Sequence, residues 1–343
     1  MDPLTQGLLG AGLAQSFARK SKVRLAAICG ALGGMAPDLD VAIRSNSDPL
    51  LAIEFHRHFT HSLAFIPIGG LIVGLVLWLV FFKDTERFRS VYIYTTIGLA
   101  THGLLDACTS YGTRLLWPFS DERIAWSVVS IIDFAVTIPL LFFVIVSAVR
   151  KSQGWAVFVM YVFILYLSYG YTKHVQVENI VREIAESRGQ VADKILLNPT
   201  IGNNILWRSI YEYDGNYYVD AIRVGVMSEP RYREGAKVPV MTTDKLFEQI
   251  GEDSVLADDV KRFSYFSQGY IYMHPAYENV IADLRYGTLP FDIRSMWGIE
   301  IIQAAPNDHA EWKVMRDFTE SDYENFWHML IEPENPGFVP IPK

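Results

Sequence analysis

The first half of the sequence carries histidine and aspartate residues at a spacing that favours metal binding. His102 and Asp106 are four positions apart, so a helix would place both side chains on one face, one turn apart. The surrounding segment is apolar, and an ionisable pair there is costly unless it meets a partner inside a helix bundle. Imidazole and carboxylate together ligate Zn²⁺ most readily, with Mn²⁺ or Fe²⁺ as alternatives. A structural hydrogen bond between helix turns is the other interpretation of this pair.

Two further clusters supply the same ligand types. Asp38 and Asp40 are separated by one residue and form the first cluster. His56, His58 and His61 form the second cluster, immediately before the apolar segment at residues 62–82. The aspartates could instead cap or end a turn. The histidines could instead form a basic cluster at the lipid headgroups. The expected topology places the three clusters near the same membrane face, and together they favour a metal site.

Charged residues near these clusters could contact a substrate. Arg57 and Arg123 could bind an anionic group beside the metal, since a guanidinium pairs well with phosphate or carboxylate. Arg123 and Glu122 end a run that begins at Trp117, whose aromatic residues are expected at the lipid interface. Asp133 opens the next apolar segment, where a helix N-cap is favoured over a ligand.

Apolar segments of membrane-spanning length must position these residues. A hydrocarbon core about 30 Å thick needs roughly 20 apolar residues in a helix. Clear segments cover residues 62–82, 128–149 and 155–171, and weaker ones cover residues 91–108, 25–37 and 4–18. The sequence therefore predicts an α-helical membrane bundle of five or six segments, formed by residues 1–171.

The distribution of charge indicates the membrane orientation, and the net charge limits the possible partners. Basic residues concentrate in the short loops after residues 18, 82 and 149, which the positive-inside rule places in the cytoplasm. The loops at 38–61 and 110–127, and everything after residue 173, are then expected to face outward. The net charge of −8 argues against nucleic acid as the main partner. Cys29 and Cys108 both lie in apolar runs, so neither a disulfide framework nor a zinc ribbon is expected.

The C-terminal part, residues 172–343, has the composition of a soluble α+β domain. An amphipathic helix is expected over residues 175–188. Strands are expected at 204–213 and 217–226, joined by a turn at Asp214-Gly215-Asn216, and further strands at 263–273 and 293–303.

The order of these motifs resembles a known family. The motifs are Pro37-Asp38-x-Asp40, His56-Arg57-x-x-Thr60-His61-Ser62, His102-x-x-x-Asp106 and Trp117-Pro118-Phe119-Ser120-Asp121-Glu122-Arg123. Over residues 1–150 the chain resembles the YdjM/YbcI family of inner-membrane proteins, which are described as metal-dependent hydrolases. Many members carry a histidine where this chain has Gln6, and a glycine where it has His58. The missing histidine could reduce a two-metal site to one metal.

We therefore predict a multi-pass inner-membrane hydrolase that uses a metal-activated water on a lipid or lipid-linked phosphoester. Asp40 would ligate the metal or support a ligand, and Asp40 or Glu122 would act as general base. Arg57 and Arg123 would bind an anionic group of the substrate. The predicted metal ligands are Asp38, His56, His61, His102 and Asp106.

Two alternatives stay open. In the first, the protein is not an enzyme, the His/Asp site is structural, and the C-terminal domain binds a partner. An open coordination position distinguishes these cases, because structural sites are closed and catalytic sites keep a water. In the second, the polar residues form an ion or proton relay, which would need a polar path across the bundle.

Overall fold

The computed structural model describes residues 1–332 and 334–342, so Pro333 and Lys343 of the predicted C-terminal domain lie outside the described residues. The chain forms two compact units. The first unit comprises Met1–Ile43, Phe55–Thr172 and Ile201–Asn203, and the second comprises Arg44–Glu54, Lys173–Thr200 and Asn204–Lys343.

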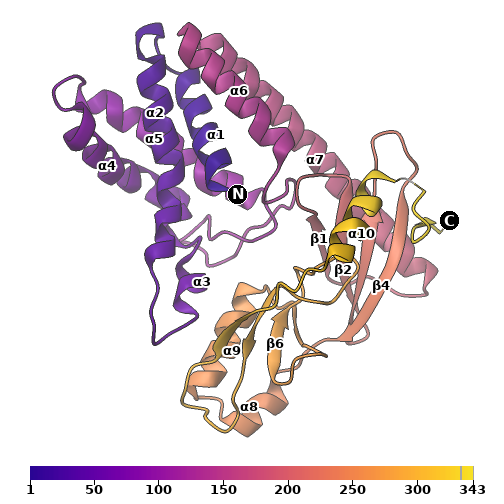
Figure 1. Cartoon of the computed structure of the whole chain (residues 1–343). Coiled ribbons are helices and arrows are strands. Elements are labelled where there is room, and N and C mark those ends of the chain that lie inside the picture. Colours follow the sequence, from indigo (N-terminus) through magenta and orange to yellow (C-terminus); the bar gives the residue numbers. More distant parts are fainter. Residues whose placement is uncertain (333, 343) are drawn as a thin grey trace. The chain divides into compact units, whose positions relative to one another are not determined.

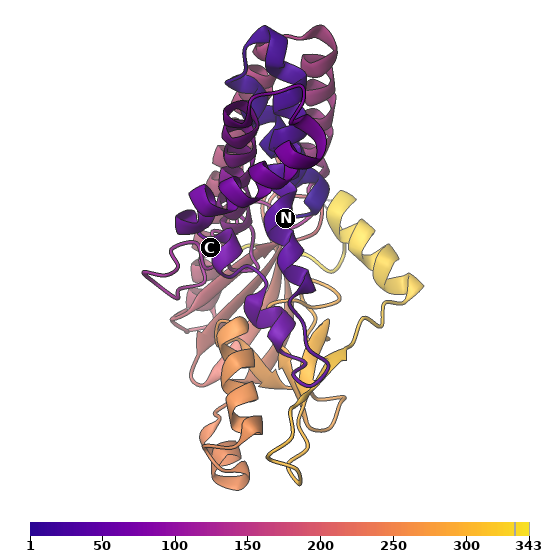
Figure 2. The ribbon, with the colours of Figure 1, turned by 90° about the vertical axis from the view of Figure 1, so that its left-hand side faces the viewer.

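The first unit is a bundle of helices joined by short 3₁₀ turns (Figures 1 and 2). Helix α1 packs on α2, α5 and α6, and α5 packs on α2 and α4. The helices are α1 (Pro3–Ser16), α2 (Val23–Met35), α4 (Ile66–Leu77), α5 (Phe88–Ala107), α6 (Phe134–Arg150) and the first part of α7 (Gln153–Ser187). The shorter turns are η1 (Lys20–Lys22), η2 (Ala36–Ala42), η3 (Phe59–His61) and η4 (Leu63–Phe65), and a π-helical turn, η5 (Trp78–Phe82), extends α4.

Glycine residues allow the central helices of this bundle to pack closely. A Cβ atom on Gly98 of α5 would overlap with the carbonyl oxygen of Gly30 on α2. A Cβ atom on Gly10 of α1 would overlap with the same carbonyl oxygen. Small residues let backbones approach in membrane proteins, where dispersion rather than hydrophobic burial drives helix association.

Three helical stretches among the described residues are long and apolar enough to cross a membrane: Lys20–Ala42, Leu63–Phe82 and Gln153–Ser187. Helix α6 is apolar but shorter. Apolar side chains on Leu63–Phe82, such as Leu71 and Val80, are exposed, as expected for lipid-facing positions. The count of five or six membrane segments is not confirmed. Helix α7 runs without a break through the predicted segment 155–171 and the predicted helix 175–188.

The second unit contains two antiparallel sheets. The larger has the order β1-β2-β3-β4-β9, formed by β1 (Ile195–Pro199), β2 (Leu206–Tyr213), β3 (Asn216–Arg223), β4 (Arg231–Pro239) and β9 (Val339–Pro340). The smaller has the order β5-β6-β7-β8, formed by β5 (Ile271–Met273), β6 (Val280–Asp283), β7 (Trp297–Glu300) and β8 (Glu311–Val314). Its remaining helices are α8 (Asp244–Ile250), α9 (Val255–Phe266), α10 (Glu320–Ile331) and most of α3 (Leu51–Phe55). The predicted order, apolar helices followed by a β-sheet-containing domain, is confirmed.

Local predictions in the second unit have mixed outcomes. The hairpin is confirmed: β2 and β3 pair around Asp214 and Gly215, whose φ angles of 47° and 67° suit a two-residue turn. The strand predicted at 263–273 is wrong over its first part, which belongs to α9. Leu256, Val260 and Phe263 recur at helical spacing and are buried, so their burial favours a helix. Only β5 remains of that strand, and only β7 of the strand predicted at 293–303.

Candidate metal centre

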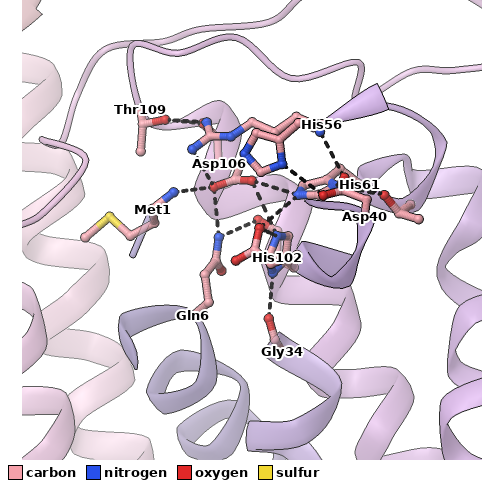
Figure 3. Close-up of polar contacts among 12 residues, drawn as sticks. Met1, Gln6, Gly34, Asp40, His56, His61, His102, Asp106 and Thr109 are labelled. Carbon is pink, nitrogen blue, oxygen red and sulfur yellow. Dashed lines mark hydrogen bonds and ion pairs between the residues drawn. The ribbon is translucent and has the colours of Figure 1, made fainter. Parts of the chain in front are cut away.

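Four side chains from three chain segments converge in the first unit. Asp38 lies in η2, His61 ends η3, and His102 and Asp106 lie on one face of α5. One ligand atom from each residue lies within 4.8 Å of the other three (Figure 3 shows His61, His102 and Asp106). The helical spacing of His102 and Asp106 therefore produces the shared face that the sequence predicts.

The four distances from imidazole nitrogens to carboxylate oxygens are close to the edge of a tetrahedral ligand set. His61 Nε2 lies 3.5 Å from Asp38 Oδ1 and 3.3 Å from Asp106 Oδ2. His102 Nε2 lies 3.4 Å from each of the same two oxygens. Zn–N and Zn–O bonds of about 2.0–2.1 Å place the corners of a tetrahedron about 3.3–3.4 Å apart. These four imidazole-to-carboxylate distances are within the range expected between ligands of one metal ion.

A backbone carbonyl fixes the tautomer of His102. Its Nδ1 atom lies 2.6 Å from the carbonyl oxygen of Gly34, at the end of α2. A carbonyl oxygen only accepts hydrogen bonds, so Nδ1 carries the proton, and in the neutral imidazole Nε2 keeps its lone pair. Metal-ligating histidines are oriented in this way by a partner on the other ring nitrogen.

Three atoms that face this centre are buried without a hydrogen-bond partner: His61 Nε2, His102 Nε2 and Asp106 Oδ2. Buried polar atoms are normally satisfied, because an unsatisfied one costs roughly 1–3 kcal/mol. A bound cation would satisfy all three at once, so the donor set fits a metal ion.

Asp40 supports His61 and is not one of the four converging residues. Its Oδ2 lies 3.3 Å from His61 Nδ1 and accepts hydrogen bonds from the Arg57 N–H and the Thr60 hydroxyl, both at 3.1 Å. Its Oδ1 lies 2.9 Å from His56 Nδ1. The structure thus places His56 against Asp40 and outside the converging set, although the sequence predicts it as a ligand.

The second oxygen of Asp106 is held from several directions (Figure 3). Gln6 Nε2 donates to Asp106 Oδ1 at 2.9 Å, and the Met1 amino group also contacts this oxygen. Arg57 Nη2 lies 3.4 Å from the same atom. Gln6 is fully buried and also donates to the His102 carbonyl at 3.3 Å. Gln6 therefore helps to orient the Asp106 carboxylate.

The two predicted arginines lie beside Tyr111. The buried Arg57 guanidinium lies 4.5 Å from the centre of that ring and donates to the Thr109 hydroxyl at 3.0 Å. The buried Arg123 guanidinium lies 5.8 Å from the same ring and donates to the Gly112 carbonyl at 2.9 Å. Glu122 is exposed and is not among the four converging residues.

Asp133 acts as a helix cap, which confirms that interpretation. Its Oδ1 accepts the Ala135 N–H at 3.0 Å at the start of α6, and its Oδ2 accepts the Tyr166 hydroxyl at 2.7 Å.

Sequence reasoning missed the backbone contributions to the centre. The Gly34 carbonyl holds His102, and a Cβ atom on Gly103 would overlap with the His61 carbonyl. Gly103 thereby lets the His61 segment lie against α5. The glycine beside His102 was the available signal, because a glycine within a helix often marks a close backbone approach.

Asp38 is the most exposed of the four converging residues. The side chains of His61 and His102 are 0% exposed and that of Asp106 is 1% exposed, whereas Asp38 is 19% exposed. The neighbouring His56 is 24% exposed. A molecule from solvent would therefore meet the centre next to Asp38.

Comparisons with known proteins find a matching family and similar proteins. The sequence profile of the YdjM inner membrane protein family matches residues 1–177. The chain is 25% identical over 267 residues to the uncharacterized protein YfhP of Bacillus subtilis strain 168, covering 76% of this chain and 77% of YfhP. It is 34% identical over 116 residues to the inner membrane protein YbcI of Escherichia coli K12, covering 32% of this chain and 63% of YbcI. No solved structure matches significantly. The profile spans more than half of the chain and includes all four converging residues, and the chain therefore belongs to the YdjM family of inner-membrane proteins.

Proposed function

We propose that this protein is a membrane-embedded, metal-dependent hydrolase. The observation that carries the proposal is the convergence of two buried imidazole nitrogens, Nε2 of His61 and of His102, on the carboxylate oxygens of Asp38 and Asp106. We assign Asp38, His61, His102 and Asp106 as ligands. Zn²⁺ is the proposed ion because the spacing suits a tetrahedron, with Mn²⁺ or Fe²⁺ as alternatives.

Bound metal would supply Lewis acidity and an activated water. The residues of this chain would determine where water and substrate reach the metal and would transfer protons. Asp38 is the most exposed of the four ligands, so water and substrate would approach there. Both oxygens of Asp40 already accept hydrogen bonds, so we assign Asp40 to orienting His61 and His56. His56 is partly exposed and held at Nδ1, and we assign it to proton transfer in place of Asp40 or Glu122.

We propose a lipid or lipid-linked phosphoester as substrate. The chain belongs to an inner-membrane family, so the centre would meet lipids directly. Arg57 and Arg123 both lie against Tyr111, and their charges would attract an anionic group. The excess of basic residues in the opposite loops supports an extracytoplasmic side for the centre and for the C-terminal domain.

One observation favours the non-enzymatic alternative. Four protein ligands complete a tetrahedron, and closed sites of this kind are structural in many zinc proteins. In that case the C-terminal domain would carry the function by binding a partner. X-ray absorption spectroscopy on the metal-loaded protein would distinguish the two, because a hydrolase should show a water ligand in addition to, or in place of, a protein ligand.

The first experiment is metal content of the detergent-purified protein, measured by elemental mass spectrometry. Near-stoichiometric metal should be present in the wild type and lost in His61→Ala, His102→Ala and Asp106→Ala. Asp133→Asn is the matched control, because Asp133 is a buried carboxylate of the same unit that faces α6 and Tyr166. Absence of metal after gentle purification and metal add-back would refute the proposal. Metal-dependent release of phosphate from lipid phosphoesters would then test hydrolysis itself.

A further inference from the structure

The segment between Asp40 and His56 connects two parts of the metal centre and belongs to the second compact unit. Residues on either side of it, Met1–Ile43 and Phe55–Thr172, belong to the first unit, whereas Arg44–Glu54 belongs to the unit that contains the C-terminal domain. We refer to Arg44–Glu54 as the connecting loop. What holds this loop bears directly on the centre, because its two ends continue into site residues.

The residues that flank the connecting loop on both sides meet at one carboxylate, that of Asp40. Asp40 Oδ1 lies 2.9 Å from His56 Nδ1, and Asp40 Oδ2 accepts the Arg57 N–H at 3.1 Å. The same Oδ2 lies 3.3 Å from His61 Nδ1. Displacement of the loop would therefore move the carboxylate that orients His61.

The body of the connecting loop is held by Arg262 of α9. Its guanidinium donates to both oxygens of Asp48, at 3.2 and 2.9 Å. It also donates from Nε to Glu54 Oε2 at 2.9 Å, and from Nη1 to Asp259 Oδ1 at 2.9 Å. One arginine thus joins two loop carboxylates to a carboxylate of its own helix.

This contact has the features of a strong ion pair. Arg262 and Asp48 are 18% and 22% exposed, and Asp259 is 0% exposed. Bidentate pairs between arginine and carboxylates combine charge with fixed geometry, and partial burial reduces screening. Although burial favours the neutral acid, the hydrogen bonds and charge of Arg262 lower the pKa of Asp48.

A second cation is not needed in this cluster. Asp48, Asp259 and His309 lie close enough together to hold a metal. However, Arg262 already forms ion pairs with both carboxylates. Asp259 Oδ2 is also engaged, since it accepts the Ala310 N–H and contacts His309 Nδ1, both at 2.9 Å. The cluster is therefore better explained as an attachment of the connecting loop.

We infer that Arg262 is a positioning residue for the metal centre, through which the C-terminal domain holds the connecting loop and thereby Asp40 and His61. The inference rests on the proposed metal centre for its effect on metal binding. Its structural part, the restraint on the loop, is measurable without a metal.

The test compares Arg262→Gln with Arg294→Gln in the full chain. Arg294 also bridges two carboxylates in the second unit, Asp292 and Asp322, but neither is in the connecting loop. Hydrogen exchange measured by mass spectrometry should show faster exchange over residues 44–61 in Arg262→Gln only. Zinc release to a chromophoric chelator should be about tenfold faster, the lower range for loss of groups that orient ligands. Arg262→Lys should give an intermediate effect, because lysine keeps the charge but loses the fork.

The outcomes separate the two ideas. Unchanged exchange over residues 44–61 in Arg262→Gln, or equal acceleration in Arg294→Gln, would overturn the role of Arg262. If exchange over residues 44–61 is faster in Arg262→Gln but the wild-type protein holds no metal, the role of Arg262 in holding the loop is supported and the metal-dependent function is refuted.

Discussion

The Nδ1 atom of His102 lies 2.6 Å from the carbonyl oxygen of Gly34. This single contact joins the end of α2 to the middle of α5 and decides which imidazole nitrogen is available to a ligand. The proton on Nδ1 leaves Nε2 facing Asp38 and Asp106. A neutral, pre-oriented imidazole is what metal coordination requires.

Replacement of Gln6 should weaken metal binding without removing a ligand. Gln6→Leu keeps the approximate volume but loses the hydrogen bonds to Asp106 and to the His102 carbonyl. We expect the metal affinity to fall by about tenfold, as for other groups that orient ligands. Competition with a chelator of known affinity would measure this change. Gln15→Leu is the control, because Gln15 is a buried glutamine of the same helix that donates to Val144. An equal loss in both variants would indicate a general packing effect.

His61 and His56 should differ sharply in their effect on metal content. His61→Ala removes a nitrogen of the converging group, so stoichiometric metal should be lost. His56→Ala removes a partner of Asp40 and should leave most of the metal bound. Elemental analysis of both purified variants checks this prediction. Complete loss of metal in His56→Ala, with the fold intact, would instead make His56 a ligand.

Chelation should destabilise the wild type. A metal at one hundred times its Kd stabilises the folded state by about 2.7 kcal/mol, so its removal should lower Tm. Thermal unfolding with and without a chelator measures the shift. His102→Ala should show no chelator-dependent shift, because it lacks a ligand. A similar shift in that variant would show that the chelator acts elsewhere.

The contact between Asp48 and Arg262 should make stability pH-dependent. The folded-state pKa of Asp48 is lowered, because the hydrogen bonds and charge of Arg262 outweigh the opposing effect of burial. Its contribution is therefore complete above the unfolded pKa of about 3.9 and is lost as pH falls through the folded value. Asp48→Asn should lower Tm at pH 6 and have less effect as the pH approaches 3. Tryptophan fluorescence during heating measures both. A Tm difference that is constant across this range would contradict the prediction.

Sequence spacing predicted the part of the centre that is helical. His102 and Asp106 share a face because four positions make about one turn, and burial of that face follows from its polarity in an apolar segment. Helical spacing could not predict which of His56 and His61 belongs to the converging group. The chain there is not a regular helix, and Arg57 has a φ of 62°. Periodicity gives no direction for side chains in such a segment, so the role of His56 as a partner of Asp40 required the structure.

The same limit explains the error at residues 263–273. Phe263 and Phe266 were interpreted as part of an aromatic strand, but they continue the buried face of a helix capped by the Ser254 side chain. The N-cap and the spacing of Leu256, Val260 and Phe263 were present in the sequence. Aromatic residues are also common in strands, so residue type alone does not distinguish the two elements here.

The side chains around the centre also restrict the ion by charge balance. Asp38, Asp40 and Asp106 contribute three negative charges, and Arg57 contributes one positive charge, while the imidazoles of His61 and His102 are neutral as ligands. The Met1 amino group, which contacts Asp106, adds a second positive charge when it is protonated. Whether or not this amino group is protonated, a trivalent ion would leave more excess positive charge than a divalent ion in a poorly solvated interior. Oxidation of a bound Fe²⁺ to Fe³⁺ would therefore be disfavoured at this position, independently of ligand type and geometry.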